Sequence, residues 1–422
     1  MIRTISYTSA EDLRFLQRDN TQDVTAIVKD IVANVRQNGD AALYEYSRKF
    51  DKAELTALEV TEAEIDEAFR QVEPEYIEIL KEAKENITSF HKHQIENGFV
   101  LTEKPGVVLG QRVLPLEKVG LYVPGGTAAY PSSVLMNCIP AVLAGCGEIV
   151  MVTPPSANGS VNPVILAAAK VAGVGRIFKV GGAQAVAALA YGTESVPKVD
   201  KIVGPGNCFV AEAKKQVFGS VDIDMIAGPS EILIVADGTC NPRFVAADML
   251  SQAEHDKLAS AILLTDSQSL AEGVSAELER QIPLLSRHEI AAHSIENYGA
   301  IVLVSSMEQA IEVSNAIAPE HLELCMDNPF DYLNLVQNAG SVFLGKNCPE
   351  PLGDYFAGPN HTLPTSGTAR FSSPLSVYDF VKRMQFTYYT SEALEQVKDK
   401  VSYFATKEGL TAHAKSATVR FE

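Results

Sequence analysis

Short apolar segments alternate with helical patterns from about residue 119 onward, and this alternation restricts the possible folds more than any other feature of the chain. A first series of predicted strands covers residues 120–123, 148–152, 176–180 and 201–203, and a second series covers residues 231–236, 261–265, 300–304, 322–326 and 340–344. Strand–helix–strand repetition is typical of parallel βαβ units. Because the two series are separated near the turn at residues 228–230, the pattern predicts two doubly wound parallel sheets of the α/β class.

The segments that flank this region have helical patterns. Thr61 and Glu64 form a capping-box signature, which predicts a long amphipathic helix from there to about residue 94. The chain from Pro374 onward is also predicted to be helical, and it ends in an amphipathic stretch at residues 408–420. Such a tail could pack on a partner subunit as an arm or on its own chain, and the pattern leaves both arrangements open.

Composition restricts the class of protein. The 422 residues suffice for two or more domains, and 46% hydrophobic with 21% charged residues is typical of a globular protein with a large core. The net charge of −18 disfavours nucleic acid as a partner, because phosphate binding needs a basic surface. An acidic surface favours cationic substrates or metal ions, although it also serves solubility alone.

Targeting and redox signals indicate the cytoplasm. No run of about 18 uncharged apolar residues is present, so no membrane span is expected. The N-terminal sequence MIRTISYTSAEDLRF lacks the apolar core of a signal peptide. The six cysteines contain no C-x-x-C pair, which argues against a disulfide framework or a cysteine zinc site and fits the reducing cytoplasm.

Residues 241–256 read NPRFVAADMLSQAEHD and are predicted to form a helix capped by Asn241. Gln252 and His255 project from neighbouring faces beside its apolar stripe, whereas Glu254 points to the opposite side. An imidazole and an amide oxygen three residues apart provide half of a possible metal or substrate site. The alternative is an ordinary amphipathic helix in which His255 complements the helix dipole, and the segment alone leaves both interpretations open.

Three glycine turns follow predicted strands, at residues 124–126, 181–184 and 204–207. Ligands bind at the carboxyl ends of parallel strands, and glycine lets backbone N–H groups approach a phosphate at a helix N-terminus. The turns therefore favour a nucleotide site. None of them is a G-x-G-x-x-G or a Walker A pattern, however, and such turns also close ordinary βα loops.

Glu320 and His321 lie at a predicted helix-to-strand junction, where side chains can reach a cleft. A carboxylate beside an imidazole provides two proton-transfer groups with different pKa values. Two polar residues that cap a loop would give the same pattern, so the pair alone does not decide between catalysis and structure.

Residues 347–368 form a long predicted loop that contains Asp354 and His361 as possible ligands. Glu408 and His413 lie five residues apart in the last helical segment, which places them about 140° apart on one helix. Any shared site would therefore use them on different sides of a ligand. The remaining histidines lie in polar runs and are predicted to be solvated: His91, His93, His288 and His293.

Eight collinear segments resemble the histidinol dehydrogenase family, and the resemblance spans nearly the whole chain. They read GLYVPGGTAAYPSSVLM, VGGAQAVAALAYGT, VGPGN, DMIAGPSEILIVAD, SQAEHD, APEHLEL, PEPLGDYFAGPNHTLPTSGTARFSSPLSV and EGLTAH. The resemblance implies oxidation of L-histidinol to L-histidine through L-histidinaldehyde, with two NAD molecules reduced, in the last steps of histidine biosynthesis. It also implies one zinc ion per subunit and a cytoplasmic homodimer whose active sites are shared through exchanged C-terminal arms.

The resemblance implies two incomplete Rossmann-like domains. The expected NAD-binding domain covers residues 122–231, and the expected substrate- and zinc-binding domain combines residues 22–121 with 232–374. A small N-terminal helical segment at residues 1–21 and a C-terminal helical arm at residues 375–422 complete the expected organisation.

Roles are carried over at positions that match the family motifs. The implied zinc ligands are Gln252, His255, Asp354 and, from the partner subunit, His413. The implied catalytic pair is Glu320 and His321. The implied NAD contacts are Tyr122, Gln184 and Asn207. The implied substrate contacts are Ser230, Gln252, His255, His321, Asp354, His361 and, from the partner, Glu408 and His413. Glutamine is not a usual zinc ligand, so residue chemistry alone does not select Gln252.

The implied chemistry gives zinc a positioning role, makes His321 the base for both hydride transfers, and makes Glu320 the group that activates water. Three alternatives stay open from the sequence. The chain could be a zinc hydrolase that uses Glu320 without NAD, a non-catalytic binding paralogue, or an NAD-dependent enzyme for a different amino alcohol.

Overall fold

A computed structural model describes residues 2–9, 11–13, 23–125 and 129–422. The chain forms two compact units. The main unit contains the chain up to Gln94 together with Glu117–Phe380, and the arm unit contains Ile95–Leu116 with Val381–Glu422. Within the described residues, no helix is long and apolar enough to cross a membrane.

The first sheet of the main unit has five parallel strands in the order β6-β5-β4-β7-β8. These are β4 (Lys118–Tyr122), β5 (Glu148–Thr153), β6 (Arg176–Lys179), β7 (Lys201–Val203) and β8 (Asp222–Ile223). They are connected by α4 (Pro131–Ala144), α5 (Pro163–Ala172), α6 (Gly182–Tyr191) and α7 (Cys208–Val217). The strand order reverses between β4 and β7, so the carboxyl ends of these two strands flank the switch point of a doubly wound sheet.

The N-terminal helices belong to the same half of the main unit as this sheet and pack mostly against its helices. They are α1 (Thr25–Tyr46), η2 (Ser47–Asp51), α2 (Glu62–Gln71), α3 (Pro74–His91) and η3 (Lys92–Gln94). Apolar residues of α1 share one core with α6 and the sheet, among them Val28, Val35 and Leu43. This part of residues 22–121 therefore shares its core with the five-stranded sheet, and the division into domains at residues 121 and 231 stays a prediction. The single long helix predicted after Thr61 is divided, because Pro74 lacks an N–H and begins a new helix.

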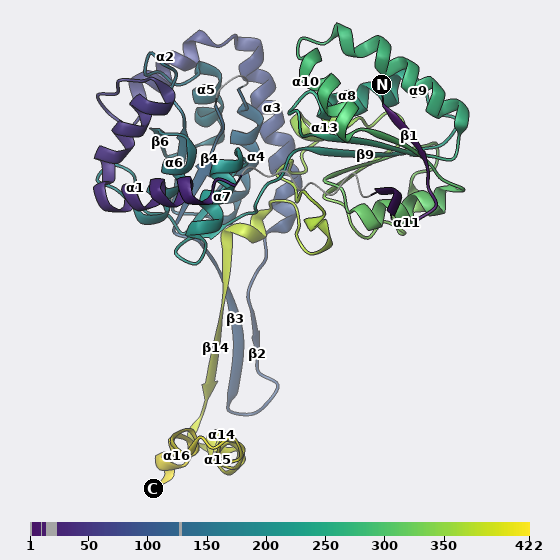
Figure 1. The fold of residues 1–422 in the computed structure, drawn as a ribbon. Helices are drawn as coiled ribbons and strands as arrows, with labels where there is room; N and C mark the ends of the chain where they lie inside the picture. The colour runs from purple at the N-terminus through teal and green to yellow at the C-terminus, as the bar shows by residue number, and fades with distance from the viewer. Residues whose placement is uncertain (1, 10, 14–22, 126–128) are drawn as a thin grey trace. The chain divides into compact units, whose positions relative to one another are not determined.

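The second sheet has six parallel strands in the order β1-β11-β10-β9-β12-β13, and Figure 1 labels β1 and β9 of this sheet. These are β1 (Arg3–Ser6), β9 (Glu231–Ala236), β10 (Ser260–Thr265), β11 (Ala300–Leu303), β12 (His321–Cys325) and β13 (Ser341–Leu344). One face is covered by α8 (Pro242–Ala253), α9 (Gln268–Gln281) and α10 (His288–Tyr298), and the other by α11 (Met307–Ile317). Successive residues of β9 alternate between these two cores, as a strand buried on both faces requires.

All strands of the two predicted series are present, with ends within two residues of the prediction. The predicted N-terminal helical segment is corrected, because Arg3–Ser6 form the edge strand β1, which pairs in parallel with β11. Residues 1, 10 and 14–21 of that segment, and Gly126 of the first glycine turn, lie outside the described residues. The smaller elements of the main unit are α12 (Phe330–Leu333), η4 (Ile282–Leu284), α13 (Glu350–Tyr355), η5 (Thr368–Arg370) and η6 (Val377–Phe380).

The arm unit begins as a three-stranded antiparallel sheet in the order β14-β3-β2, which corrects the prediction of an all-helical C-terminal tail. Its strands are β2 (Phe99–Leu101), β3 (Val107–Pro115) and β14 (Val381–Tyr389). Its helices are α14 (Ser391–Glu395), α15 (Lys398–Lys407), α16 (Thr411–Thr418) and η7 (Val419–Phe421). A turn at Lys104-Pro105-Gly106 joins β2 to β3, with Gly106 at a positive φ of 75°.

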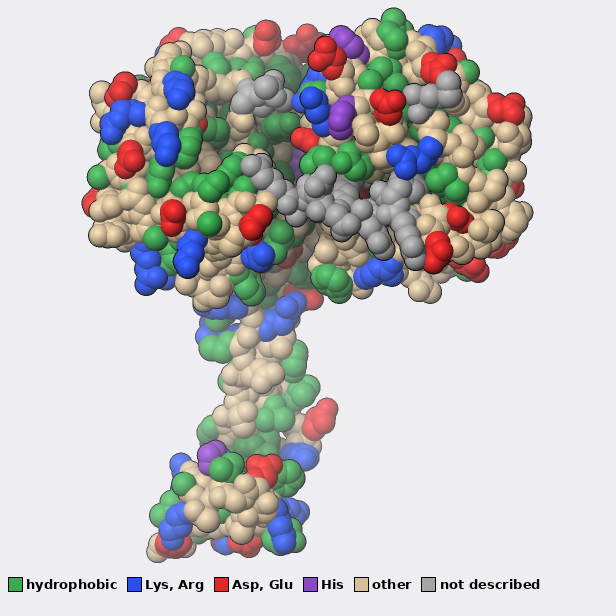
Figure 2. Space-filling view, in the orientation of Figure 1, with side chains coloured by type: hydrophobic (Ala, Val, Ile, Leu, Met, Phe, Trp, Pro, Cys, Tyr) green, Lys and Arg blue, Asp and Glu red, His purple; other side chains and the backbone are tan. Residues whose placement is uncertain are grey.

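Charged side chains of both signs are interspersed over the visible face of the main unit (Figure 2). Inside it, Lys214 and Asp224 form an ion pair with side chains only 2% and 1% exposed. Both side chains form hydrogen bonds with the backbone of Gly204. Asp224 Oδ2 accepts a bond of 2.7 Å from its N–H, and Lys214 Nζ donates a bond of 3.0 Å to its carbonyl oxygen. This pair therefore fixes the start of the glycine turn after β7.

Replacing Lys214 with methionine should lower the free energy of unfolding by about 3–5 kcal/mol, because Asp224 would keep a buried charge without its partner. The neighbouring Lys215 provides a matched control, since its side chain is 62% exposed and pairs with Glu212 at 3.5 Å. Lys215→Met should cost about 1 kcal/mol or less. Urea denaturation of both variants measures the difference, and equal losses would contradict a structural role for the buried pair.

Candidate active site

The candidate site is built at the amino ends of β9 and β12 in the six-stranded sheet. Ser230 directly precedes β9, Glu320 directly precedes β12, and His321 is the first residue of β12. Because α8 runs back along the sheet after β9, its last turn brings Gln252 to the same edge. Ligands of open α/β sheets usually bind at the carboxyl ends, so this placement could not be inferred from fold class.

His321 is 3% exposed, and its hydrogen bond defines its tautomer. Nδ1 lies 2.9 Å from the backbone carbonyl of Glu231, and a carbonyl only accepts, so Nδ1 carries the hydrogen. In the neutral ring, Nε2 is then a bare lone-pair nitrogen with no hydrogen-bond partner among the described residues. Burial lowers the pKa of His321, which favours this neutral form. The arrangement provides a general base.

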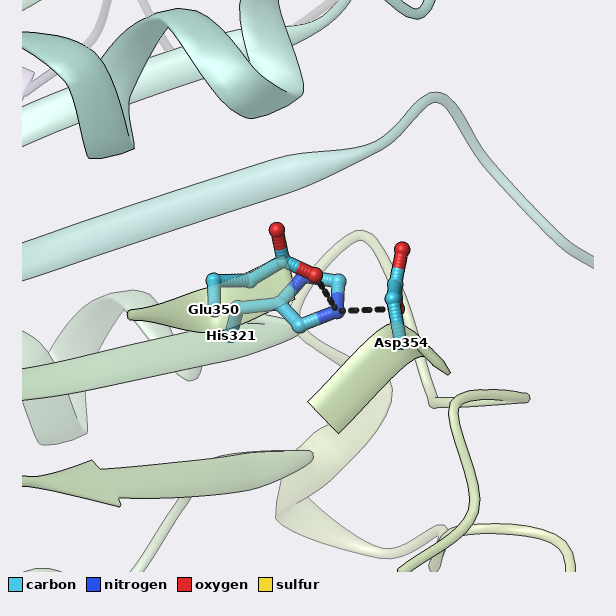
Figure 3. Close-up of side chains that lie close together, drawn as sticks. All are labelled: His321, Glu350 and Asp354. Carbon is cyan, nitrogen blue, oxygen red and sulfur yellow. Dashed lines mark ion pairs between the residues drawn. The ribbon is translucent and has the colours of Figure 1, made fainter. Parts of the chain in front are cut away.

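Nε2 of His321 faces two carboxylates that come from α13. It lies 3.6 Å from Glu350 Oε1 and 3.9 Å from Asp354 Oδ1, as Figure 3 shows. Potential ligand atoms of these three residues all lie within 4.8 Å of one another. Burial, and next the neighbouring Glu350, raise the pKa of Asp354 well above its usual range. Such a cluster of buried acids and imidazole matches the donor chemistry of a divalent cation.

Glu320 is a buried carboxyl whose Oε2 accepts a hydrogen bond of 2.9 Å from the Glu231 N–H. Burial, and after it the neighbouring carboxylate of Glu231, raise the pKa of Glu320 well above its usual range. The same oxygen lies 3.6 Å from His321 Nδ1, so the two predicted catalytic groups are adjacent. The structure thus brings together an acid and an imidazole whose pKa values shift in opposite directions.

Gln252 is a buried amide that the surrounding residues leave without hydrogen bonds. Its side chain is 1% exposed, and both Oε1 and Nε2 lack a hydrogen-bond partner among the described residues. A buried amide is normally satisfied, so this one fits a site completed by a bound group. The fit supports a metal with an oxygen donor from Gln252.

His255 lies just beyond the end of α8 at Ala253, which corrects the prediction that it projects from the helix. A turn hydrogen bond from His255 N–H to the Gln252 carbonyl, at 3.1 Å, holds the residue beside the helix end. Its Nδ1 lies 3.4 Å from the Ser230 hydroxyl, and burial lowers its pKa. Two predicted substrate contacts are therefore in direct contact with each other.

His361 joins the two sheets of the main unit. Its Nδ1 lies 2.9 Å from the backbone carbonyl of Asp354, and its Nε2 lies 3.3 Å from the hydroxyl of Ser133 in α4. Burial lowers the pKa of His361 to about 4, so the ring is neutral near pH 7. Nearby, Thr362 Oγ1 donates to Asn137 Oδ1 at 3.0 Å. These contacts bring the loop after α13 against the five-stranded half.

Glu350 is a site residue that the sequence analysis missed. It is 1% exposed, and its Oε1 has no hydrogen-bond partner among the described residues. It precedes Asp354 by four residues, a spacing that puts both side chains on one face of a helix. That spacing was the available signal, but the prolines and glycines of residues 347–368 predicted an irregular loop rather than α13.

The predicted NAD contacts lie around the switch point of the five-stranded sheet. Tyr122 ends β4, and its hydroxyl accepts a hydrogen bond of 3.1 Å from the Gly182 N–H at the start of α6. Burial raises the pKa of Tyr122 to about 12. Gln184 is buried in the first turn of α6, and Asn207 caps α7 through Oδ1, 3.1 Å from the Phe209 N–H. The structure thus places all three at the carboxyl edge.

Glu408 and His413 belong to the arm unit, where both line one groove of about 780 Å³. The expectation that they share one helix is wrong. α15 ends at Lys407, and the chain turns at Gly409, with a φ of 79°, before α16 begins. The break removes the 140° separation and lets both side chains face the same groove.

The four remaining histidines differ in burial. His93, His288 and His293 are exposed. The prediction is wrong for His91, which is fully buried, with Nδ1 2.7 Å from Gln94 Oε1. His91 continues the buried stripe of α3 formed by Ile77, Leu80, Ala83 and Ile87, and that periodicity outweighs its polar neighbours.

A doubly wound sheet with glycine turns at its switch point, beside a buried acid–imidazole cluster, defines an α/β enzyme. The sequence model of the family described as "Histidinol dehydrogenase" matches residues 16–421, so the chain belongs to that family and is an oxidoreductase of histidine biosynthesis. It is 58% identical to the histidinol dehydrogenase of Clostridium acetobutylicum, covering 98% of this chain and 96% of the relative.

Two further comparisons agree with the family assignment. The histidinol dehydrogenase of Listeria innocua is 54% identical, with 100% of this chain and 99% of the relative covered. The crystal structure of histidinol dehydrogenase from Elizabethkingia anophelis superposes with a TM-score of 0.94 at 40% identity, covering 99% of this chain and 98% of that one. This likeness confirms the predicted α/β fold class.

Proposed function

We propose that the chain oxidises L-histidinol to L-histidine through L-histidinaldehyde, reduces two NAD molecules, and uses one zinc ion per subunit in the cytoplasm. The observation that carries the proposal is the buried neutral His321, whose bare Nε2 faces the acidic cluster beside Glu320. A base in that tautomer is what removal of an alcohol proton requires. Family membership identifies the alcohol as histidinol.

Gln252, His255 and Asp354, with His413 from a partner subunit, would hold the zinc ion. Their chemistry fits, because an amide oxygen, imidazole nitrogens and a carboxylate are hard or borderline donors, and the Gln252 amide lacks any other partner. When bound, the metal holds the imidazole and amine of the substrate in position. Ser230 and His361 lie next to these ligands and would contact the same substrate.

Tyr122, Gln184 and Asn207 would contact NAD, which accepts the hydride when bound. The N-termini of α6 and α7 lie at this edge, and helix N-termini favour anionic phosphates. The buried Lys214–Asp224 pair keeps the turn before Asn207 in one backbone conformation. These features support a dinucleotide site at the switch point.

In the first oxidation, Nε2 of His321 accepts the hydroxyl proton as the substrate carbon loses hydride. In the second, Glu320 takes a proton from water as the water oxygen adds to the aldehyde carbon, and His321 returns the proton from the first step to the former carbonyl oxygen, which gives the hydrate and a neutral His321. Nε2 of His321 then accepts the proton of the hydrate as the second hydride leaves. The raised pKa of Glu320 makes its carboxylate a stronger base for water.

Replacing Glu320 with glutamine separates the two steps. The variant should keep most of the oxidation of histidinol to the aldehyde, because His321 is unchanged. Oxidation of supplied histidinaldehyde should fall by about 10²-fold or more, since the base that activates water is lost. Single-turnover absorbance at 340 nm with each substrate measures both steps. Equal losses in the two steps would contradict the assignment of Glu320 to water.

The arm unit supports a homodimer with shared sites. The groove that holds Glu408 and His413 is lined by apolar Val401, Phe404 and Leu410, and these three side chains are exposed in the single chain. Contiguous exposed apolar surface of this kind marks an interaction site. A second copy of the chain is the proposed occupant, and its main unit would receive the two polar side chains.

The direct test is an increase in absorbance at 340 nm with the purified chain, histidinol and NAD. Two moles of NADH per mole of histidinol are expected. No reduction of NAD with the zinc-loaded protein would favour a zinc hydrolase. NAD reduction with another amino alcohol but not with histidinol would replace the substrate and keep the reaction class.

A further inference from the structure

Glu350 is held so that one oxygen is fixed and the other is free. It begins α13, where its backbone N–H donates to Glu323 Oε1 at 2.8 Å, and its Oε2 accepts from the Ser251 hydroxyl at 3.2 Å. Oε1 has no hydrogen-bond partner among the described residues and lies toward His321 Nε2 (Figure 3). Ser251 belongs to the last turn of α8, next to Gln252, so Glu350 is tied to the helix that carries the expected ligand.

The two mostly buried carboxyl groups of Glu350 and Asp354 form a favourable place for a cation. Glu350 and Asp354 each offer a carboxylate oxygen, and these oxygens lie within 4.8 Å of one another and of a ring nitrogen of His321. No ion pair among the described residues joins either of them to a lysine or arginine, and their charged partners are only histidines. Buried carboxylates are normally paired with a positive group or bound to a metal.

We propose that Glu350 is a metal ligand of this site, with Oε1 binding the divalent cation beside Asp354. The inference rests on the proposed function, which assigns zinc to Gln252, His255, Asp354 and the arm of a partner. Two unsatisfied groups independently support it: the Gln252 amide and the free Oε1 of Glu350 lie on contacting elements, and neither has a partner among the described residues.

The proposal has a consequence for how metal is retained. Gln252, His255, Glu350 and Asp354 all come from one main unit, so a single chain provides four metal donors before any partner contributes. A second carboxylate also increases the charge compensation of a divalent cation. The main unit should therefore bind zinc when the arm of a partner contributes nothing.

Glu350→Gln tests the proposal in the full chain, because glutamine keeps the volume and removes the charge. Metal is removed with a chelator, and zinc is titrated back in competition with a chromophoric chelator, which reports the dissociation constant without any activity measurement. We expect zinc binding to weaken about tenfold or more. The visible absorption spectrum of the cobalt-substituted protein should also change, since a ligand is altered.

Two variants make the outcome decisive. Glu254→Gln removes the same charge two residues after Gln252 but outside the cluster, and it should leave the zinc dissociation constant within about twofold of the unmodified value. Asp354→Asn should lose zinc. If Glu350→Gln keeps its zinc affinity and cobalt spectrum while Asp354→Asn loses zinc, Glu350 is not a ligand. That result would overturn the inference about Glu350 and leave the proposed metal site intact. Retention of zinc by Asp354→Asn would instead refute the proposed metal site.

Folding is checked separately by circular dichroism of each metal-free variant. If Glu350→Gln does not fold, Glu350→Asp is titrated in its place. The shorter side chain keeps the charge but withdraws the oxygen from the cluster, so it too should weaken zinc binding. An unchanged zinc dissociation constant in a folded Glu350→Asp protein would count against a ligand role.

Discussion

Replacing His321 with asparagine should lower the rate of NAD reduction by about 10³-fold or more with histidinol and with histidinaldehyde alike. Both oxidations need a base at the same position, and asparagine cannot accept the proton. The change should leave KM for histidinol within a few-fold, because the assigned metal ligands are untouched. Steady-state kinetics with each substrate measures the effect, and zinc content measured by atomic absorption tests whether the site is otherwise intact.

The matched control is His293→Asn. His293 is exposed in the same unit, and its Nδ1 lies 3.1 Å from the backbone carbonyl of Lys257. Its replacement should leave both rates unchanged. A His321→Asn enzyme that keeps near-normal rates while retaining zinc would end the assignment of His321 as the base. Loss of zinc would show that the imidazole belongs to the metal site instead.

Mixing two inactive variants should restore activity if arms are exchanged between subunits. A His413→Ala chain keeps an intact His321, and a His321→Asn chain keeps an intact His413. A heterodimer of the two would have one complete site and one doubly defective site. After random exchange of subunits, about a quarter of the sites should be intact, so the mixture should recover about a quarter of the normal rate.

The experiment needs proof that subunits have exchanged, which differently tagged chains and sequential affinity purification provide. Each variant is first measured alone and should be nearly inactive. A mixture of His321→Asn with Asp354→Asn is the control, because both changes lie in the main unit and heterodimers would contain no complete site. No recovery in verified heterodimers would show that His413 acts within its own chain.

The strands were predictable where burial on both faces makes them continuous apolar runs. β9 and β10 are examples, since their sequences EILIVA and SAILLT leave little choice of structure. β1 and β14 were not predictable in this way. β14 has mostly exposed side chains, and its conformation follows from pairing along its full length with β3, which is distant in sequence. Local patterns do not contain such pairings.

The site residues also differ in whether local sequence reveals them. Glu320 and His321 were found because they are adjacent in sequence and fall at an element boundary. Glu350 was missed because its importance comes from burial against His321 and Ser251, residues that lie 29 and 99 positions away. The tautomer of His321 was also beyond the sequence, since it depends on the backbone carbonyl of Glu231.

The two halves of the main unit present opposite helix ends at their sites, and these ends favour ions of opposite charge. α6 and α7 present their N-termini at the edge that holds Tyr122, whereas α8 presents its C-terminal turn beside Gln252. Helix dipoles make the first location favourable for an anion and the second favourable for a cation. A pyrophosphate and a metal ion would therefore be favoured at different edges by the backbone alone, with the anion at the glycine turns and the cation beside Gln252.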